Sequence, residues 1–158
     1  MPGQREDYLL RQLEILRHLV ARLVGHREPA GIEAALQLAY DLQEKLFGMP
    51  AADFLRQDVG AQVATLARHE SRTAGQEKIL TYAGLLQETA RVHAFRGHDD
   101  LAVGARQLAL HVALHVALDA PAPPAAAALV RELRDALGTE ELYPPVRAML
   151  EVFAQQDG

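Results

Sequence analysis

Alanine and leucine together make up about a third of this sequence, and their abundance is the feature that most restricts its fold. The 158 residues include 28 Ala and 25 Leu, but only 3 Ile and 11 Val. Alanine and leucine are the strongest apolar helix formers, whereas the β-branched residues that favour strands are scarce here. The composition therefore predicts an all-α fold without a sheet.

Proline and glycine divide the chain into segments, because proline is tolerated in the first turn of a helix and glycine closes its end. Within the segments apolar residues recur at steps of three and four, as at Leu9, Leu13, Leu16 and Val20, which is typical of amphipathic helices. The pattern predicts antiparallel helices joined by short turns. We expect a short segment at 50–56 and about seven helices near residues 6–24, 30–47, 59–69, 73–96, 100–118, 125–137 and 146–155.

The composition also excludes several classes of function. The absence of cysteine rules out disulfides, thiolate nucleophiles and cysteine-based zinc sites. A net charge of −5 argues against nucleic acid as a partner. No apolar run is long enough to cross a bilayer, and the first residues lack the pattern of a signal peptide. We therefore expect a cytoplasmic protein that does not bind membranes and needs no cofactor.

The segment from Leu86 to Leu118 resembles a tetratricopeptide repeat, a helix-turn-helix unit of about 34 residues. Ala90, Ala102 and Ala109 match the small packing positions of the repeat, and Gly97 matches its turn. Three positions depart from the pattern, with Leu86 in place of Trp, Arg106 in place of an aromatic residue, and Leu114 in place of the terminal proline. No second repeat of equal quality is evident in the chain.

The N-terminal half extends this resemblance. Residues 7–14, followed by a leucine-rich helix and an alanine-rich helix that ends at 46–48, look like a group of small uncharacterised bacterial proteins with tetratricopeptide-like hairpins. The resemblance implies a right-handed stack of antiparallel hairpins, and the length of the chain suits a single domain spanning 1–158. Its core would lie at about 6–118, with a C-terminal helical pair at about 124–156. The resemblance implies no activity.

Two histidines four residues apart raise the possibility of a metal site. His111 and His115 project from the same side of a helix, and with Asp119 they offer the side chains that bind a transition metal. A zinc hydrolase of the related type needs a glutamate beside the first histidine, where this chain has Val112. The same histidines continue a polar stripe with Gln107, and we favour this plain polar face over the metal.

Two other polar clusters are candidates for chemistry. His93, His98, Asp99 and Asp100 meet at a predicted turn, but acidic residues at a helix start are explained by capping, and we expect His93 to be packed and hydrogen-bonded. The only serine, Ser71, lies in a polar stretch without a nucleophile motif. Just beyond it, residues 73 and 76 have the spacing of a capping box, which predicts a helix start at residue 73.

These observations favour a protein-protein interaction or scaffold module without enzymatic activity over the alternative of a metal-dependent helical enzyme. In a stack of hairpins, the first helix of each successive hairpin lines a concave groove. We therefore expect the outward residues of the fifth helix and its predecessor to contact a protein or peptide partner, namely Tyr82, Gln87, Arg91 and Arg68. The helix at 6–24 is apolar on more than one side, and we expect it to mediate a homodimer.

Overall fold

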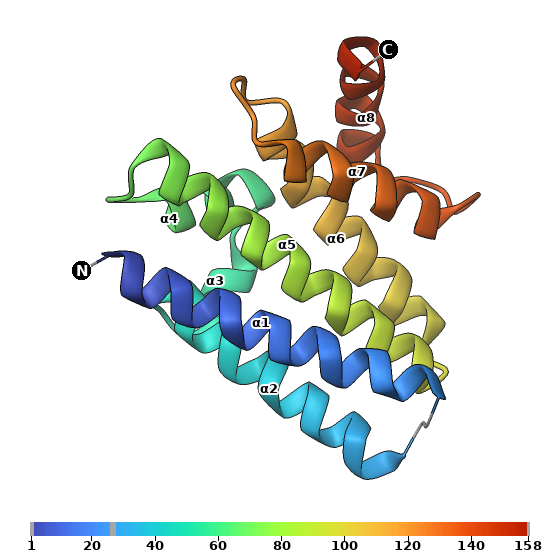
Figure 1. Cartoon of the computed structure of the whole chain (residues 1–158). Helices are drawn as coiled ribbons and strands as arrows, with labels where there is room; N and C mark the ends of the chain where they lie inside the picture. Colours follow the sequence, from blue (N-terminus) through green and yellow to red (C-terminus); the bar gives the residue numbers. More distant parts are fainter. Residues whose placement is uncertain (1, 26–27, 158) are drawn as a thin grey trace.

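The chain is all-helical. A computed structural model describes residues 2–25 and 28–157, with the side chains of 2–7, 24 and 25 left out, and in this part it contains eight α-helices and no strand (Figure 1). The predicted all-α class is confirmed. The helices are α1 (Pro2–Gly25), α2 (Pro29–Phe47), α3 (Ala51–Arg56), α4 (Val59–Ala67), α5 (Arg72–Phe95), α6 (Asp99–Ala117), α7 (Pro124–Leu137) and α8 (Pro144–Asp157).

Most helix boundaries follow the proline and glycine pattern. Pro29, Pro124 and Pro144 begin helices, as expected from a residue with fixed φ and no N–H to donate. Gly48 and Gly97 follow helix ends with φ angles of 66° and 76°, a conformation that glycine adopts without the strain of a side chain. The clearest differences are that α1 begins earlier than predicted and that the segment at 50–56 contains a helical turn.

The start of α5 differs from the predicted capping box. The hydroxyl of Ser71 accepts a hydrogen bond from the amide of Ala74 at 3.1 Å, so Ser71 is the N-cap and the capping box at residue 73 is wrong. The Gln76 side chain donates instead to the backbone carbonyls of Asp119 and Pro121, at 3.4 and 3.3 Å. It thereby ties the first turns of α5 to the connection between α6 and α7.

Helix α5 lies at the centre of the molecule and contacts α1, α2, α4, α6 and α7 (Figure 1). Every residue from 81 to 90 is buried, polar residues included. On one side, the Tyr82 ring meets Phe47 and Phe54 edge-on, each at 5.4 Å between centroids. A helix covered in this way has almost no outward side along its middle turns.

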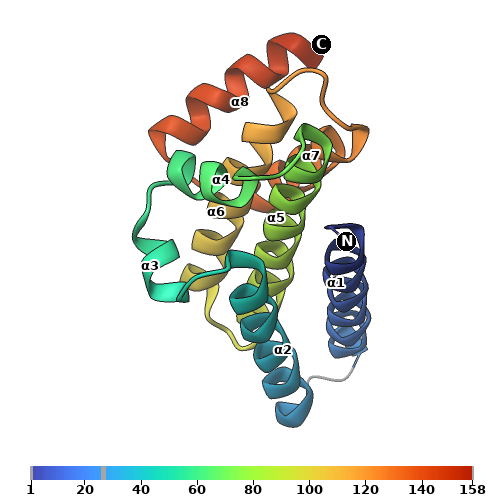
Figure 2. The same ribbon diagram turned by 90° about the vertical axis from the view of Figure 1, so that its left-hand side faces the viewer.

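Helices α5 and α6 form the predicted antiparallel hairpin, and α7 and α8 pack against α6 at the far end from α2 (Figure 2). The buried Gln107 side chain on α6 anchors the connection to α8. Its amide donates to the Glu141 carbonyl at 2.7 Å, and its side-chain oxygen accepts from the Tyr143 amide at 3.3 Å. The polar stripe predicted through Gln107 is therefore not a solvated face at this position, because the C-terminal pair covers it.

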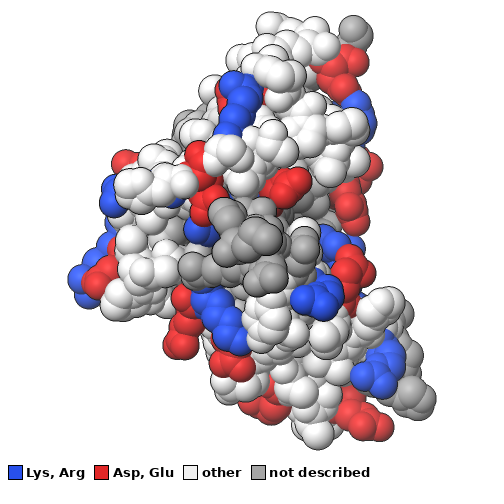
Figure 3. All heavy atoms as spheres, turned by 60° about the vertical axis from the view of Figure 1, so that its left-hand side comes forward, with Lys and Arg blue, Asp and Glu red and all other residues white. Residues whose placement is uncertain are grey.

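The surface carries both signs of charge. On the face in Figure 3, basic and acidic side chains of the described residues alternate, and neither sign gathers into an extended patch. Among the described residues, no helix is both long enough and apolar enough to span a bilayer.

Candidate functional site

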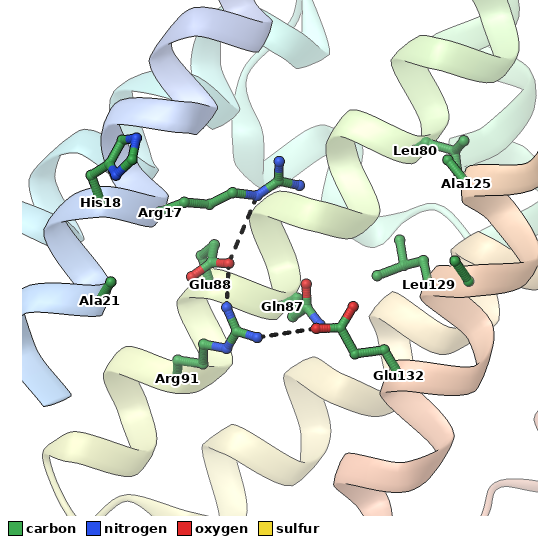
Figure 4. Close-up of a pocket in the computed structure, with 11 residues that line it drawn as sticks. Arg17, His18, Ala21, Leu80, Gln87, Glu88, Arg91, Ala125, Leu129 and Glu132 are labelled. Atoms are coloured by element: carbon green, nitrogen blue, oxygen red, sulfur yellow. Dashed lines mark hydrogen bonds and ion pairs between the residues drawn. The ribbon is translucent and has the colours of Figure 1, made fainter.

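A groove of about 610 Å³ lies on the surface of α5 between α1 and α7 (Figure 4). We call it the α1–α7 groove. Its walls are partly apolar and include small side chains from both flanking helices, which leave room for an occupant. The apolar lining residues are Ala21 on α1, Leu80 on α5, and Ala125, Ala128 and Leu129 on α7.

The packing of α1 places its polar residues at the edge of this groove. In α1, Leu13, Leu16 and Val20 belong to the buried row that faces the core. Arg17 and Ala21 each follow a buried residue by one position, so they lie on the side of the helix that borders the groove. Glycine at position 84 of α5 assists this approach. A Cβ at that position would lie 3.0 Å from Arg17 Nη2 and 3.3 Å from Leu13 Cδ2.

A chain of charged side chains crosses the groove from α1 to α7 (Figure 4). Arg17 Nη1 lies 2.8 Å from a carboxylate oxygen of Glu14, and its Nε lies 3.9 Å from Glu88 Oε1. Arg91 Nη1 donates to the same Glu88 oxygen at 2.6 Å, and its Nη2 contacts Glu132 on α7 at 3.3 Å. Glu88 therefore contacts Arg17 of α1 directly and is linked to Glu132 of α7 through Arg91.

Glu88 is the unusual member of this chain. The side chain is only 1% exposed, and its Oε2 atom is buried without a hydrogen-bond partner. Burial raises the pKa of Glu88, because a carboxylate loses its hydration there, while Arg91 and Arg17 act in the opposite direction. Buried polar atoms are nearly always hydrogen-bonded, so this oxygen calls for an explanation.

The structure separates the four residues predicted to contact a partner. Gln87 and Arg91 both line the α1–α7 groove. Tyr82 is completely buried, and its hydroxyl donates to the side-chain oxygen of buried Gln62 at 3.0 Å, so the prediction that Tyr82 points outward is wrong. Arg68 is exposed at the end of α4 and does not line this groove.

Sequence reasoning missed Arg17, Glu88 and Glu132. The spacing of Glu88 and Arg91 is that of a helical ion pair and is visible in the sequence. The contributions of Arg17 and Glu132 depend on the docking of α1 and α7 against α5, which no local pattern indicates.

The histidines of α6 do not form a three-ligand site. The rings of His111 and His115 stack with centroids 5.4 Å apart, and burial lowers the pKa of both. Asp119, the third candidate ligand, contacts Arg72 at 3.2 Å. Within the side chains that the structure describes, no three from His, Asp or Glu are grouped so that they could hold a metal ion.

The turn between α5 and α6 also lacks a metal-binding group among the described side chains. Asp99 and Asp100 lie in the first turn of α6, where the helix dipole favours negative charge. The Nδ1 atom of His93 is buried without a partner, so the expected hydrogen bond of this side chain is absent at that atom. Burial lowers the pKa of His93, and the neighbouring Arg96 and His98 lower it further.

Comparison with protein families, with curated proteins and with solved structures finds no match for this chain. The geometry of the α1–α7 groove is therefore the basis for assigning a function.

Proposed function

We propose that this chain is a protein-protein interaction module, without enzymatic activity of its own, that binds a segment of a partner polypeptide in the α1–α7 groove. The observation that supports this function is the unpartnered oxygen of Glu88 in that groove. A buried polar atom without a partner costs stability. Natural chains tolerate such a cost at functional sites more readily than elsewhere.

The lining of the groove suits a polypeptide segment. Ala125 and Ala128 are exposed on one wall and leave space for an entering backbone or side chain. Arg91 and Gln87 supply polar groups beside this apolar surface. Interfaces commonly combine an apolar centre with polar groups, and arginine is enriched in them.

We also propose a tetratricopeptide-like relationship for the α5 and α6 hairpin. Three features support it, namely the burial of Ala90, Ala102 and Ala109, which match the small positions of the repeat, the left-handed Gly97 at the turn, and the antiparallel packing of the two helices. A scaffold of this kind fits a cytoplasmic protein, and we propose that two copies associate through α1.

Blocking the groove tests the interaction function. Ala128→Tyr fills the groove from an exposed position of α7, and Ala136→Tyr places the same side chain at an exposed position of α7 outside it. We expect immobilised parent protein and the Ala136→Tyr control to capture the same partner from native cell lysate, and Ala128→Tyr to lose it. Equal capture by both variants, with unchanged circular dichroism, would contradict the proposed function.

A further inference from the structure

The ion-pair chain across the α1–α7 groove is not balanced in charge. It contains three carboxylates, those of Glu14, Glu88 and Glu132, and two guanidinium groups, those of Arg17 and Arg91. Three carboxylates against two guanidinium groups leave the chain with one negative charge in excess. Glu88 is the most deeply buried of the carboxylates, so solvent screens its charge least.

Glu88 can also accept more hydrogen bonds than it receives. A carboxylate has about four acceptor sites. Among the described residues only Arg91 Nη1 donates to it, since Arg17 Nε at 3.9 Å lies beyond hydrogen-bond distance and Oε2 has no partner. The missing component is therefore a hydrogen-bond donor with a positive charge.

We propose that the partner segment inserts a lysine side chain whose ammonium group donates to the Glu88 carboxylate. This inference rests on the proposed function. A lysine ammonium is a compact charge that fits a single free acceptor, whereas the planar fork of an arginine needs two. The methylene stem would pack on Leu129 and the alanines of α7, as lysine stems do on apolar surfaces. An anionic group would have to displace carboxylates from Arg17 and Arg91.

Arg17 is the neighbour of Glu88 whose contacts leave it free to turn aside as the lysine enters. Its contact with Glu88 is long, at 3.9 Å, and its contact with Glu14 is short, at 2.8 Å. The Arg17 side chain is 42% exposed, so it can turn toward Glu14 without losing its charge partner. Because Glu88 is one of the residues that line the groove, an ammonium group entering beside Arg17 comes within reach of its carboxylate.

Small charged molecules test whether the groove of the whole chain binds an ammonium group. We expect n-butylammonium to shift the amide resonances of Glu88 and Leu129 saturably, with a dissociation constant on the order of 1 mM, and to lower the pKa of Glu88. Glu88→Gln should abolish these shifts. Glu77→Gln, the same change at an exposed site of α5 outside this groove, should preserve them. Shifts with n-butyrate instead would overturn the proposal, because they would indicate an anion site.

A short helical peptide with one central lysine tests whether Glu88 binds a lysine that belongs to a polypeptide. We expect it to bind roughly tenfold more tightly than the same peptide with acetyl-lysine, as for a charge-assisted hydrogen bond, and Glu88→Gln should remove this difference. Arg17→Gln should strengthen lysine binding, which a purely structural ion-pair chain would not do. Equal binding of the two peptides, or n-butylammonium binding as tightly as the lysine peptide, would overturn the inference.

The experiments can contradict the proposed function and the lysine inference independently of each other. If Ala128→Tyr loses the captured partner but the lysine and acetyl-lysine peptides bind equally, the groove remains an interface and only the lysine is wrong. If Ala128→Tyr keeps the partner, the proposed function is wrong, whatever the peptides do.

Discussion

The carboxylate of Glu88 makes the stability of the protein depend on pH in an unusual direction. Because its pKa is raised above the ordinary value of 4.5, the folded state binds the proton more tightly than the unfolded state does. The free energy of unfolding contributed by this group therefore falls as pH rises from 4.5 through the raised pKa. At neutral pH the buried charge is a cost.

We predict that Glu88→Gln raises the free energy of unfolding by about 1 kcal/mol at pH 7.5 and by less at pH 5, since glutamine does not titrate. Urea denaturation at the two pH values measures this. Glu132→Gln, at an exposed partner of Arg91, should change stability by less than about 0.5 kcal/mol. Destabilisation by Glu88→Gln at both pH values would mean that the ion-pair chain is a net source of stability.

Tyr82 has a structural role instead of the predicted contact with a partner. Burial raises the pKa of its hydroxyl, which stays protonated and donates to Gln62. We predict that Tyr82→Phe costs about 1–2 kcal/mol, because it leaves the Gln62 oxygen buried without a donor. Thermal denaturation measures the loss. Tyr143→Phe, at a Tyr side chain exposed to solvent, is the control, and an equal loss in both variants would contradict this role.

At the level of helices, the sequence predicted which segments are helical and roughly where each ends, because proline and glycine act locally. It did not predict which sides of α5 are covered. Periodicity assumes one buried and one exposed side, whereas α5 is surrounded by five other helices and buries polar residues such as Gln87 and Thr89. Gln107 is a similar case, since its partners lie more than thirty residues away in the chain.

Gln107 on α6 ties down the connection that leads into α8 through two side-chain hydrogen bonds. We predict that Gln107→Leu accelerates amide hydrogen exchange in α8 severalfold while α5 remains protected, because the variant removes the side-chain bonds to the Glu141 carbonyl and the Tyr143 amide. Native-state hydrogen exchange with mass spectrometry measures both helices. Gln37→Leu, at an exposed position of α2, should leave α8 unchanged. Exchange that increases equally throughout the molecule would show a global effect instead.

At the scale of the whole molecule, the candidate site contains some residues that local sequence patterns predicted and others that only the packing of the helices brings together. Gln87 and Arg91 were predicted as contact residues and do line the groove, but its walls come from α1 and α7, which lie far from α5 in the sequence. Only the packing of these helices brings Arg17 and Glu132 into one ion-pair chain with Glu88 and Arg91. A site of this kind depends on tertiary contacts at each of its edges.

The uncovered side of α1 bears on assembly. Tyr8 and Ile15 lie two helical turns apart on α1, Tyr40 lies on the neighbouring α2, and all three are exposed. Apolar side chains of this size on adjoining helices favour association of two copies about a twofold axis, in which each copy contributes the same surface.

We predict that the 17.3 kDa chain scatters light as a dimer at micromolar concentration. Ile15→Arg should produce monomers, because a twofold contact places the introduced charges of both copies close together. Leu101→Arg is the matched control, since Leu101 on α6 is 54% exposed and Ile15 is 51% exposed. A monomeric parent protein, or equal dissociation by the two variants, would show that this side of α1 is ordinary surface. The α1–α7 groove would then be the stronger candidate for an interface.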